Sequence, residues 1–122
     1  MTCKLRLKRQ SYSTKQHRAM EKTERYIMLV TVDIPADKER AWNDWYNNEH
    51  VPDILKCPGF KRVGRFKSLQ GNGPRYVTIY ELEHPNVRES EEFARVKGWY
   101  QFTDFVIEPR ISIYREFLAA EA

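Results

Sequence analysis

The chain has 122 residues, of which 41% are hydrophobic and 13% aromatic, a size and composition that suit one packed domain. No apolar run approaches the roughly 18 residues that a transmembrane helix needs, so we expect a soluble, cytoplasmic protein with no membrane partner. The two cysteines, Cys3 and Cys57, show no metal-ligand spacing and follow no secretory signal, which favours a reducing compartment over a disulfide-bonded protein.

The net charge of +4 belongs to the beginning of the chain. Six of the 21 basic residues and no acidic ones precede Met20, so the other 15 basic residues face 17 acidic ones and carry a net charge of −2. Residues 1–19 suit a disordered arm, an extension upstream of a start at Met20, or an acid-free targeting segment. We therefore expect a flexible basic arm or extended start over 1–23 and one folded domain over 24–122. Because no basic face rich in aromatic residues follows, we expect no nucleic-acid partner.

The folded part is predicted to begin with a strand and a helix. Residues 26–33 are rich in β-branched and aromatic side chains and end near a proline, which predicts a strand. Asp37 is a candidate N-cap for a helix that runs to about Glu49. Proline disfavours helical geometry at the residue before it, so we expect a kink or break at Val51 and a short helical turn to Leu55.

The rest of the chain predicts three strands and one further helix. The expected elements are a strand over 60–67, a hairpin loop over 71–74, a strand over 75–83, a helix over about 88–97 with Ser90 as a possible cap, and a last strand over 111–117. The order β-α-β-β-α-β is the split arrangement of α+β, ferredoxin-like folds, in which helices cover one face of a four-stranded antiparallel sheet.

The first predicted helix carries ionisable groups beside its aromatic stripe. With about 3.6 residues per turn, one face holds Trp42, Trp45, Tyr46 and Glu49, with His50 at its edge. A buried ionisable group costs several kcal/mol unless it is paired or neutralised, so the pattern indicates a pocket. The expected position of His50 near a helix C-terminus favours its imidazolium form, whereas burial opposes it.

A family resemblance rests on four stretches of the chain: the run from Trp45 to Leu55, then Pro58-Gly59-Phe60, Arg65-Phe66, and Pro74-Arg75-Tyr76 through Leu82. Together they resemble the EthD-like branch of the dimeric alpha-beta barrel superfamily, over about residues 26–117. The resemblance implies a homodimer, in which the open sheet face of one ferredoxin-like protomer packs on that of a second copy. It also implies a ligand cleft between the helices and the sheet of each protomer.

Relatives in this superfamily act as polyketide cyclases, decarboxylases, dehydratases, monooxygenases, muconolactone isomerases or haem proteins, so the fold alone does not fix the chemistry. Several use a histidine as an acid or base without a metal or organic cofactor, and His50 matches that position. The resemblance thus implies His50 as a catalytic residue and no cofactor.

Glu49 and Tyr80 are the other two catalytic candidates. Glu49 would orient His50 or cap the backbone, and a direct pair requires the break at Val51, since adjacent helix residues do not face each other. Tyr80 would donate a hydrogen bond to an oxyanion, or it would belong to the core.

The substrate-binding candidates are Trp42, Trp45, Tyr46, Asp53, Arg65 and Trp99. Asp53 also suits the first turn of a helix, where a carboxylate interacts favourably with the dipole. Arg65 would bind a substrate carboxylate or lie at a dimer edge, and Trp99 would form part of an aromatic wall or a dimer contact. No HxH, HxxxH or CxxC spacing occurs, so we expect no metal site.

Three functions follow from this pattern. The leading one is a homodimeric, cofactor-independent lyase, isomerase or cyclase that binds a small hydrophobic or aromatic metabolite and uses His50 as general acid or base. The second is a non-catalytic dimeric binding or accessory module, in which Glu49 and His50 only fix the helix break. The third is a haem-binding dimeric barrel with His50 as the axial ligand.

Overall fold

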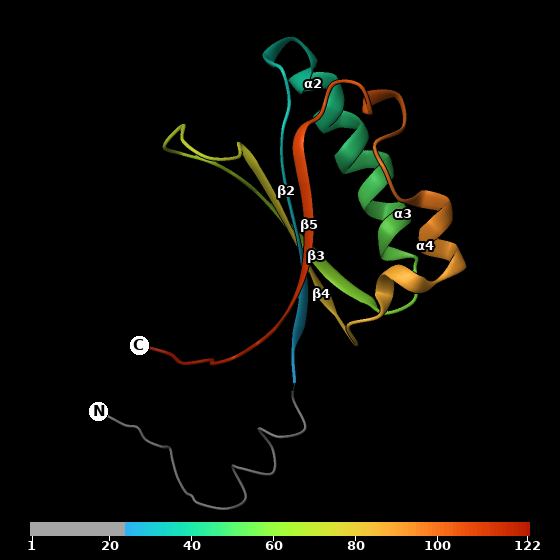
Figure 1. Cartoon of the computed structure of the whole chain (residues 1–122), viewed down its shortest axis with the longest axis vertical. Coiled ribbons are helices and arrows are strands. Elements are labelled where there is room, and N and C mark those ends of the chain that lie inside the picture. The colour runs from blue at the N-terminus through green and yellow to red at the C-terminus, as the bar shows by residue number, and fades with distance from the viewer. Residues whose placement is uncertain (1–23) are drawn as a thin grey trace, which may run out of the picture.

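The structure is a computed structural model that describes residues 24–122, so the basic arm expected over residues 1–23 lies outside the part described. Four strands form one antiparallel sheet in the order β3-β4-β2-β5: β2 (Tyr26–Asp33), β3 (Phe60–Lys67), β4 (Tyr76–Leu82) and β5 (Ile107–Arg115). The helices α2 (Ala36–Trp45), α3 (Val51–Leu55) and α4 (Glu91–Val96) all lie against one face of this sheet (Figure 1). This arrangement confirms the predicted α+β, ferredoxin-like fold.

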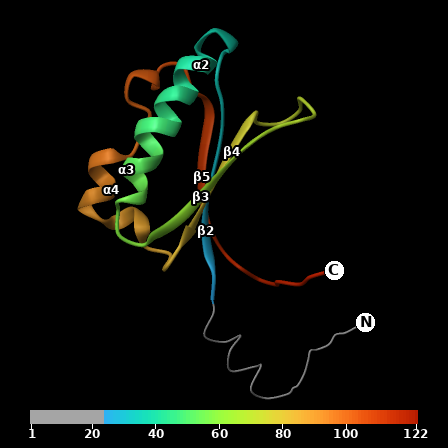
Figure 2. The same ribbon diagram turned by 180° about the vertical axis from the view of Figure 1, so that it is seen from behind.

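The two faces of the sheet differ in what covers them. Along β4, Tyr76, Thr78, Tyr80 and Leu82 are buried beneath the helices, and the residues between them point to the opposite, uncovered face. Seen from behind, the same layer of helices lies on one side only, and the other side of the sheet stays open (Figure 2). Arg65 pairs with Thr78 in the β3–β4 ladder, so Arg65 belongs to the covered face.

Two apolar clusters fill the space between the helices and the sheet. The first consists of Met28, Val30, Ile54, Cys57, Phe60, Tyr80, Leu82, Val87 and Phe93. The second consists of Val32, Ile34, Trp42, Trp45, Tyr46, Tyr76 and Phe102. Trp99 packs against both clusters and therefore marks the place where they meet.

The helical segment between β2 and β3 continues through Val51 without a break. A π-helix, η2 (Tyr46–His50), joins α2 directly to α3, and Val51 keeps helical backbone angles of φ −60° and ψ −49°. The break expected at Val51 is therefore wrong. The proline after Val51 lacks an N–H and its ring crowds the carbonyl four residues earlier, and the wider π-turn accommodates both effects without ending the helix.

Other element boundaries differ slightly from the prediction. α2 begins at Ala36 after Pro35 without a side-chain cap, so Asp37 lies inside the first turn and is not the N-cap. Ser90 does cap α4, because its Oγ accepts a hydrogen bond of 3.0 Å from the backbone N–H of Phe93. β5 begins at Ile107, earlier than expected, because it pairs along most of β2.

No helix among the described residues is long and apolar enough to cross a membrane.

A polar cluster fastens α2 to the sheet at the end of the β3–β4 hairpin. The Tyr76 hydroxyl donates to the Glu39 carboxylate and accepts from Asn43 Nδ2 at 2.8 Å. Lys67 Nζ and Arg75 Nη1 also lie 3.0 Å and 2.9 Å from the two Glu39 oxygens. The Tyr76 hydrogen bond and the Lys67 ammonium keep the pKa of Glu39 below its ordinary value of 4.5. Glu39 is therefore ionised and paired at neutral pH.

Candidate functional site

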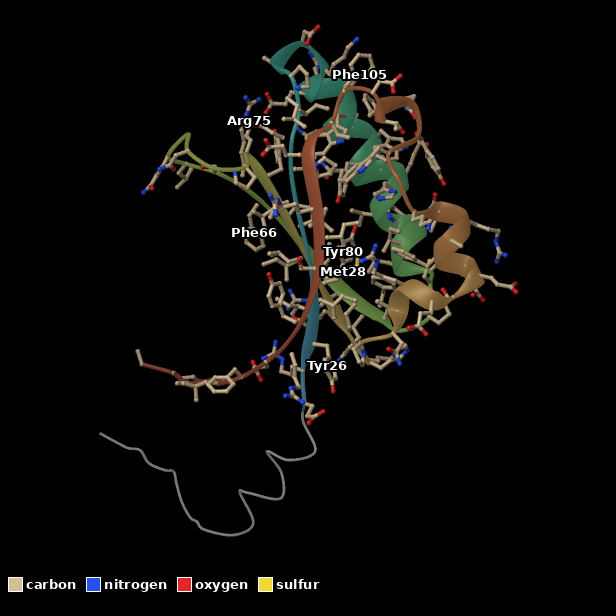
Figure 3. The ribbon with its side chains drawn as sticks, viewed as in Figure 1. Tyr26, Met28, Phe66, Arg75, Tyr80 and Phe105 are labelled. Carbon is tan, nitrogen blue, oxygen red and sulfur yellow. The ribbon has the colours of Figure 1, made fainter. Side chains whose placement is uncertain are left out.

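A cavity of about 40 Å³ lies between the helices and the sheet. Its lining residues are Met28, Val30, Tyr46, His50, Ile54, Tyr80, Phe93, Lys97, Gly98, Trp99 and Ile111. Figure 3 shows Met28 and Tyr80 on the helix side of the sheet. Since a water needs roughly 10–15 Å³ of such space, the cavity holds only a few heavy atoms. A larger hollow of about 420 Å³ beside Thr31 and Arg110 contains none of the predicted site residues.

His50 is the central polar residue of this cavity. Its imidazole is 6% exposed, stacks on Trp45 and meets Tyr46 edge to face with ring centroids 5.1 Å apart. Nδ1 has no hydrogen-bond partner among the described residues. Burial lowers the pKa of His50 from 6.5 to about 4, although Asp53 raises it, and Arg65 lowers it further. The imidazole is therefore neutral at neutral pH, and the expected stabilisation of the imidazolium by a helix end is wrong because the helix continues past His50.

Glu49 does not share this face. Its side chain is exposed, and the described interactions include no hydrogen bond or ion pair between Glu49 and His50. The π-turn inserts one residue relative to a regular α-helix, so His50 takes the angular position that Glu49 would have had. The predicted place of Glu49 on the aromatic stripe is therefore wrong, and the structure brings only His50 to the cavity.

Two buried phenols complete the polar lining. Tyr80, on β4, is 1% exposed, and its hydroxyl has no hydrogen-bond partner in the described part of the chain. Burial, together with the nearby Tyr46, raises the pKa of Tyr80 far above its ordinary value. Burial also raises the pKa of Tyr46, an effect that Thr78, Tyr80 and Arg65 partly oppose. Both phenols therefore keep their protons at neutral pH and can donate hydrogen bonds to a ligand.

The three predicted tryptophans occupy different positions. Trp99 lines the cavity, with its ring centroid 5.9 Å from that of Tyr46 and 6.2 Å from that of His50. Trp42 and Trp45 are buried behind the lining and hold Tyr46 and His50 in place through edge-to-face and stacked contacts. They support the wall of the site but do not form its surface.

Arg65 lies behind Tyr46, in a cage of aromatic rings. Its guanidinium carbon is 4.0 Å from the ring centroid of Tyr46, 5.0 Å from that of Trp42 and 5.3 Å from that of Tyr76. Nη1 donates to Asn47 Oδ1 at 2.7 Å, whereas Nε and Nη2 are buried without a hydrogen-bond partner among residues 24–122. Burial lowers the pKa of Arg65. The side chain lies on the helix-covered face of β3, an edge strand of the sheet, and the alternative position at a dimer edge stays a prediction.

One predicted site residue lies outside the cavity lining, and two lining residues were not predicted. Asp53 is half-buried in the first turn of α3 and affects the pKa of His50, but it does not line the cavity. Sequence reasoning missed Phe93 and Lys97, which line the cavity from α4 and the residue after it. The spacing of Phe93 within an apolar helix face was the available signal, and Lys97 had none.

Residues 24–122 hold no group of three or more His, Cys, Asp or Glu side chains placed to bind a metal.

Comparisons with known proteins agree with the fold. Residues 25–97 match a family model described as a domain of unknown function, DUF4286. An uncharacterised 11.0 kDa protein from the thcB–thcC intergenic region of Rhodococcus erythropolis is 30% identical over 76 residues, which cover 60% of this chain and 73% of that protein.

Solved structures with low sequence identity share the architecture. An EthD family protein from Bacillus halodurans is 15% identical over 75% of this chain and 99% of its own, with a TM-score of 0.56. A protein from Bordetella bronchiseptica, provisionally described as an antibiotic biosynthesis monooxygenase, is 14% identical over 79% of this chain and 100% of its own, with a TM-score of 0.61. These two likenesses concern the fold alone. Because the family model spans more than half of the chain, this protein belongs to the DUF4286 family.

Proposed function

We propose that this protein binds a small organic molecule in the cavity at His50 and that His50 acts there as a general acid or base without a cofactor. One observation carries the proposal: His50 Nδ1 and the Tyr80 hydroxyl belong to residues that line one cavity, and both are buried without a partner in the described chain. A buried polar group left unpaired costs about 1–3 kcal/mol. A bound ligand that supplies the missing partners would recover that cost.

The residues of the cavity suit proton transfer next to a carbonyl group. Neutral His50 would accept a proton from the carbon beside the carbonyl, the electron pair of that C–H bond would form a C=C bond to the carbonyl carbon, and the π pair of the C=O bond would move to the oxygen. The hydroxyls of Tyr46 and Tyr80 would donate hydrogen bonds to the resulting oxyanion. The negative charge would in turn raise the pKa of His50 and favour the imidazolium. Enolisation, dehydration, decarboxylation and ring closure all suit such a site.

The size of the cavity limits the ligand. Ligand pockets usually measure about 300–1,000 Å³, whereas this cavity measures about 40 Å³ in one protomer. A small hydrophobic ligand fits the apolar walls, and a larger aromatic one requires the segment around Gly98 and Trp99 to move outwards. A porphyrin is far larger than the cavity, so the haem alternative does not fit this site.

A non-catalytic binding module is the second candidate. The observation that favours it is the pKa of about 4 for His50, because a general base works best when its pKa lies near the operating pH. Under this alternative, His50→Ala weakens ligand binding, and no turnover of the ligand is seen with the unaltered protein.

We further propose that the protein is a homodimer that pairs through the open face of the sheet. This face carries Ile27, Leu29, Val77 and Ile79, and Phe66 and Tyr114 are 56% and 50% exposed. An apolar surface of this kind is typical of an interface, and the resemblance to dimeric alpha-beta barrel proteins supports a dimer. Ile79→Lys is expected to give monomers, whereas Lys61→Glu at an exposed position of β3 is expected to leave the dimer intact.

Native mass spectrometry of the purified protein tests both proposals. We expect the mass of a dimer, with a small organic molecule that is released under denaturing conditions. His50→Ala should lose the bound molecule and keep the dimer, and the exposed His84→Ala should keep both. A bound molecule that His50→Ala retains would contradict the proposed site, and a strict monomer would contradict the proposed interface.

A further inference from the structure

We infer that the ligand of the His50 cavity is a small organic anion, a carboxylate or an enolate of few heavy atoms. This inference rests on the proposed function and names the ligand class of the same site. It starts from a positive charge, that of Arg65, which lacks a negative partner in the described chain.

Arg65 differs from the paired arginines of the described residues. Arg25, Arg62 and Arg75 each lie within 4.0 Å of a carboxylate oxygen. Arg65 has no such carboxylate among residues 24–122, and its polar partner is the neutral amide of Asn47. Its Nε and Nη2 are nevertheless buried. A buried charge is costly unless an opposite charge compensates it, so Arg65 leaves this region of the protein electropositive.

The uncompensated charge lies one aromatic ring away from the cavity. The guanidinium carbon of Arg65 is 4.0 Å from the centroid of the Tyr46 ring, and Tyr46 lines the cavity. The charge of Arg65 favours the anionic forms of Tyr46 and Tyr80 and the neutral form of His50, so all three polar lining residues experience its field.

The lining itself contributes donors and a second positive charge but no acid. Tyr46 and Tyr80 supply O–H groups, and Lys97 lines the cavity as well. No aspartate or glutamate occurs among the lining residues. Asp53 is the one acid that acts on His50, and it does so from α3, outside the lining. An anion in the cavity would compensate Arg65 and accept charge-assisted hydrogen bonds from the Tyr46 and Tyr80 hydroxyls.

Acetate and acetamide test this inference, because they have nearly the same shape and differ in charge. Both are small enough for a cavity of a few heavy atoms. Binding is followed at constant ionic strength by tryptophan fluorescence, since Trp99 lines the cavity, and by the NMR signals of the His50 ring. We expect acetate to bind about tenfold or more tightly than acetamide, the difference between a charge-assisted and a neutral hydrogen bond.

Variants of two arginines on β3 assign the source of this selectivity. Arg65→Met is expected to reduce acetate affinity about tenfold and to leave acetamide affinity unchanged. Arg62→Met is the matched control. Arg62 lies on the same strand as Arg65 but on the open face of the sheet, and it forms an ion pair with Glu81. It should leave both affinities unchanged. If Arg65→Met fails to fold, Lys97→Met at an exposed position should still reduce acetate affinity selectively.

The outcomes separate the inference from the function on which it rests. If acetamide binds as tightly as acetate, or if Arg65→Met and Lys97→Met both keep the acetate preference, the inferred ligand class is wrong and the cavity remains a binding site. If neither compound perturbs the His50 ring at any attainable concentration, the inference and the proposed function both fail.

Discussion

The imidazole of His50 lies nearly parallel to the indole of Trp45, with ring centroids 4.7 Å apart and an angle of 19° between the planes, although five positions separate them in the chain. In a regular α-helix the side chains that meet are three or four positions apart. The π-turn η2 lengthens this spacing by one residue and so turns His50 towards the sheet. The geometry of the proposed ligand site therefore depends on one irregular turn of a helix.

Deleting Asn48 should convert this turn into regular α-helix. Asn48 is exposed within η2, and its removal leaves Trp45 and His50 four positions apart, still on one face. We expect the melting temperature to stay the same or rise slightly, because a rare turn is replaced by a common one, and we expect ligand binding to weaken as Tyr46 and His50 shift. Thermal unfolding and fluorescence titration measure the two effects.

Deletion of Asp44 is the matched control, since Asp44 is exposed in the regular part of α2. That deletion rotates Trp45 and everything after it away from the core and should lower the melting temperature strongly. A comparable loss from the Asn48 deletion would show that the π-turn is required for folding and not for the site.

Tyr80→Phe should separate a ligand-binding role from a structural one. The Tyr80 hydroxyl is buried without a partner among the described residues, so its removal should leave the free energy of unfolding unchanged or raise it by up to about 1 kcal/mol. Ligand binding should decrease, because the ligand loses a donor. Urea unfolding and ligand titration of the purified variant check these expectations.

Tyr76→Phe provides the comparison on the same strand and face. Its hydroxyl bonds to Glu39 and Asn43, so this variant should lose about 1–3 kcal/mol of stability. Should Tyr80→Phe lose as much, the Tyr80 hydroxyl would have a structural partner after all.

The fold could be predicted from the sequence because its signals are local. The strand expected over 60–67 coincides with β3, and Ser90 marked the start of α4. Two of the predicted site residues, His50 and Tyr80, line one cavity in the structure, and their catalytic roles stay predictions. Glu49 was misplaced because a 3.6-residue period was applied through a turn that does not follow it, and no residue pattern marks a π-turn reliably.

Other features of the site depend on contacts distant in sequence. The aromatic cage around Arg65 brings residues of α2, η2 and β4 to a side chain on β3. Strand periodicity predicts which face of the sheet Arg65 occupies, but not that Arg65 lacks a carboxylate partner among the described residues. Lys97 lines the cavity because the chain leaves α4 there, which depends on how α4 packs on the sheet. Such placements follow from tertiary packing and carry no signature in a single sequence.

The depressed pKa of His50 predicts a loss of stability in mild acid. The folded pKa of about 4 lies below the unfolded value of 6.5, so the unfolded chain binds the extra proton as the pH falls through this interval. Stability is highest above pH 6.5 and should fall by about 2 kcal/mol between pH 7 and pH 5. Urea unfolding at the two pH values measures it.

His50→Phe should remove this difference, because phenylalanine keeps an aromatic ring beside Trp45 and has no proton to gain. The exposed His84 remains in both proteins and so cancels in the comparison. An unchanged pH dependence in His50→Phe would mean that the folded protein already binds the proton on His50 near pH 6.

Glu39 predicts a second loss of stability in stronger acid. Its pKa in the folded protein lies below 4.5 because Tyr76 and Lys67 stabilise the carboxylate, so its contribution is present above pH 4.5 and is lost as the pH falls through the folded pKa. Glu39→Gln should reduce the free energy of unfolding by about 1.5–3 kcal/mol at pH 7, the range for a hydrogen bond to a charged group. The variant and the unaltered protein should converge once the pH falls below the folded pKa of Glu39. Glu83→Gln, at an exposed position without a described ion pair, is the control and should change stability little at either pH. An effect of Glu39→Gln that stays constant from pH 7 down to the onset of acid unfolding would contradict an ionised Glu39 as the link between α2 and the hairpin.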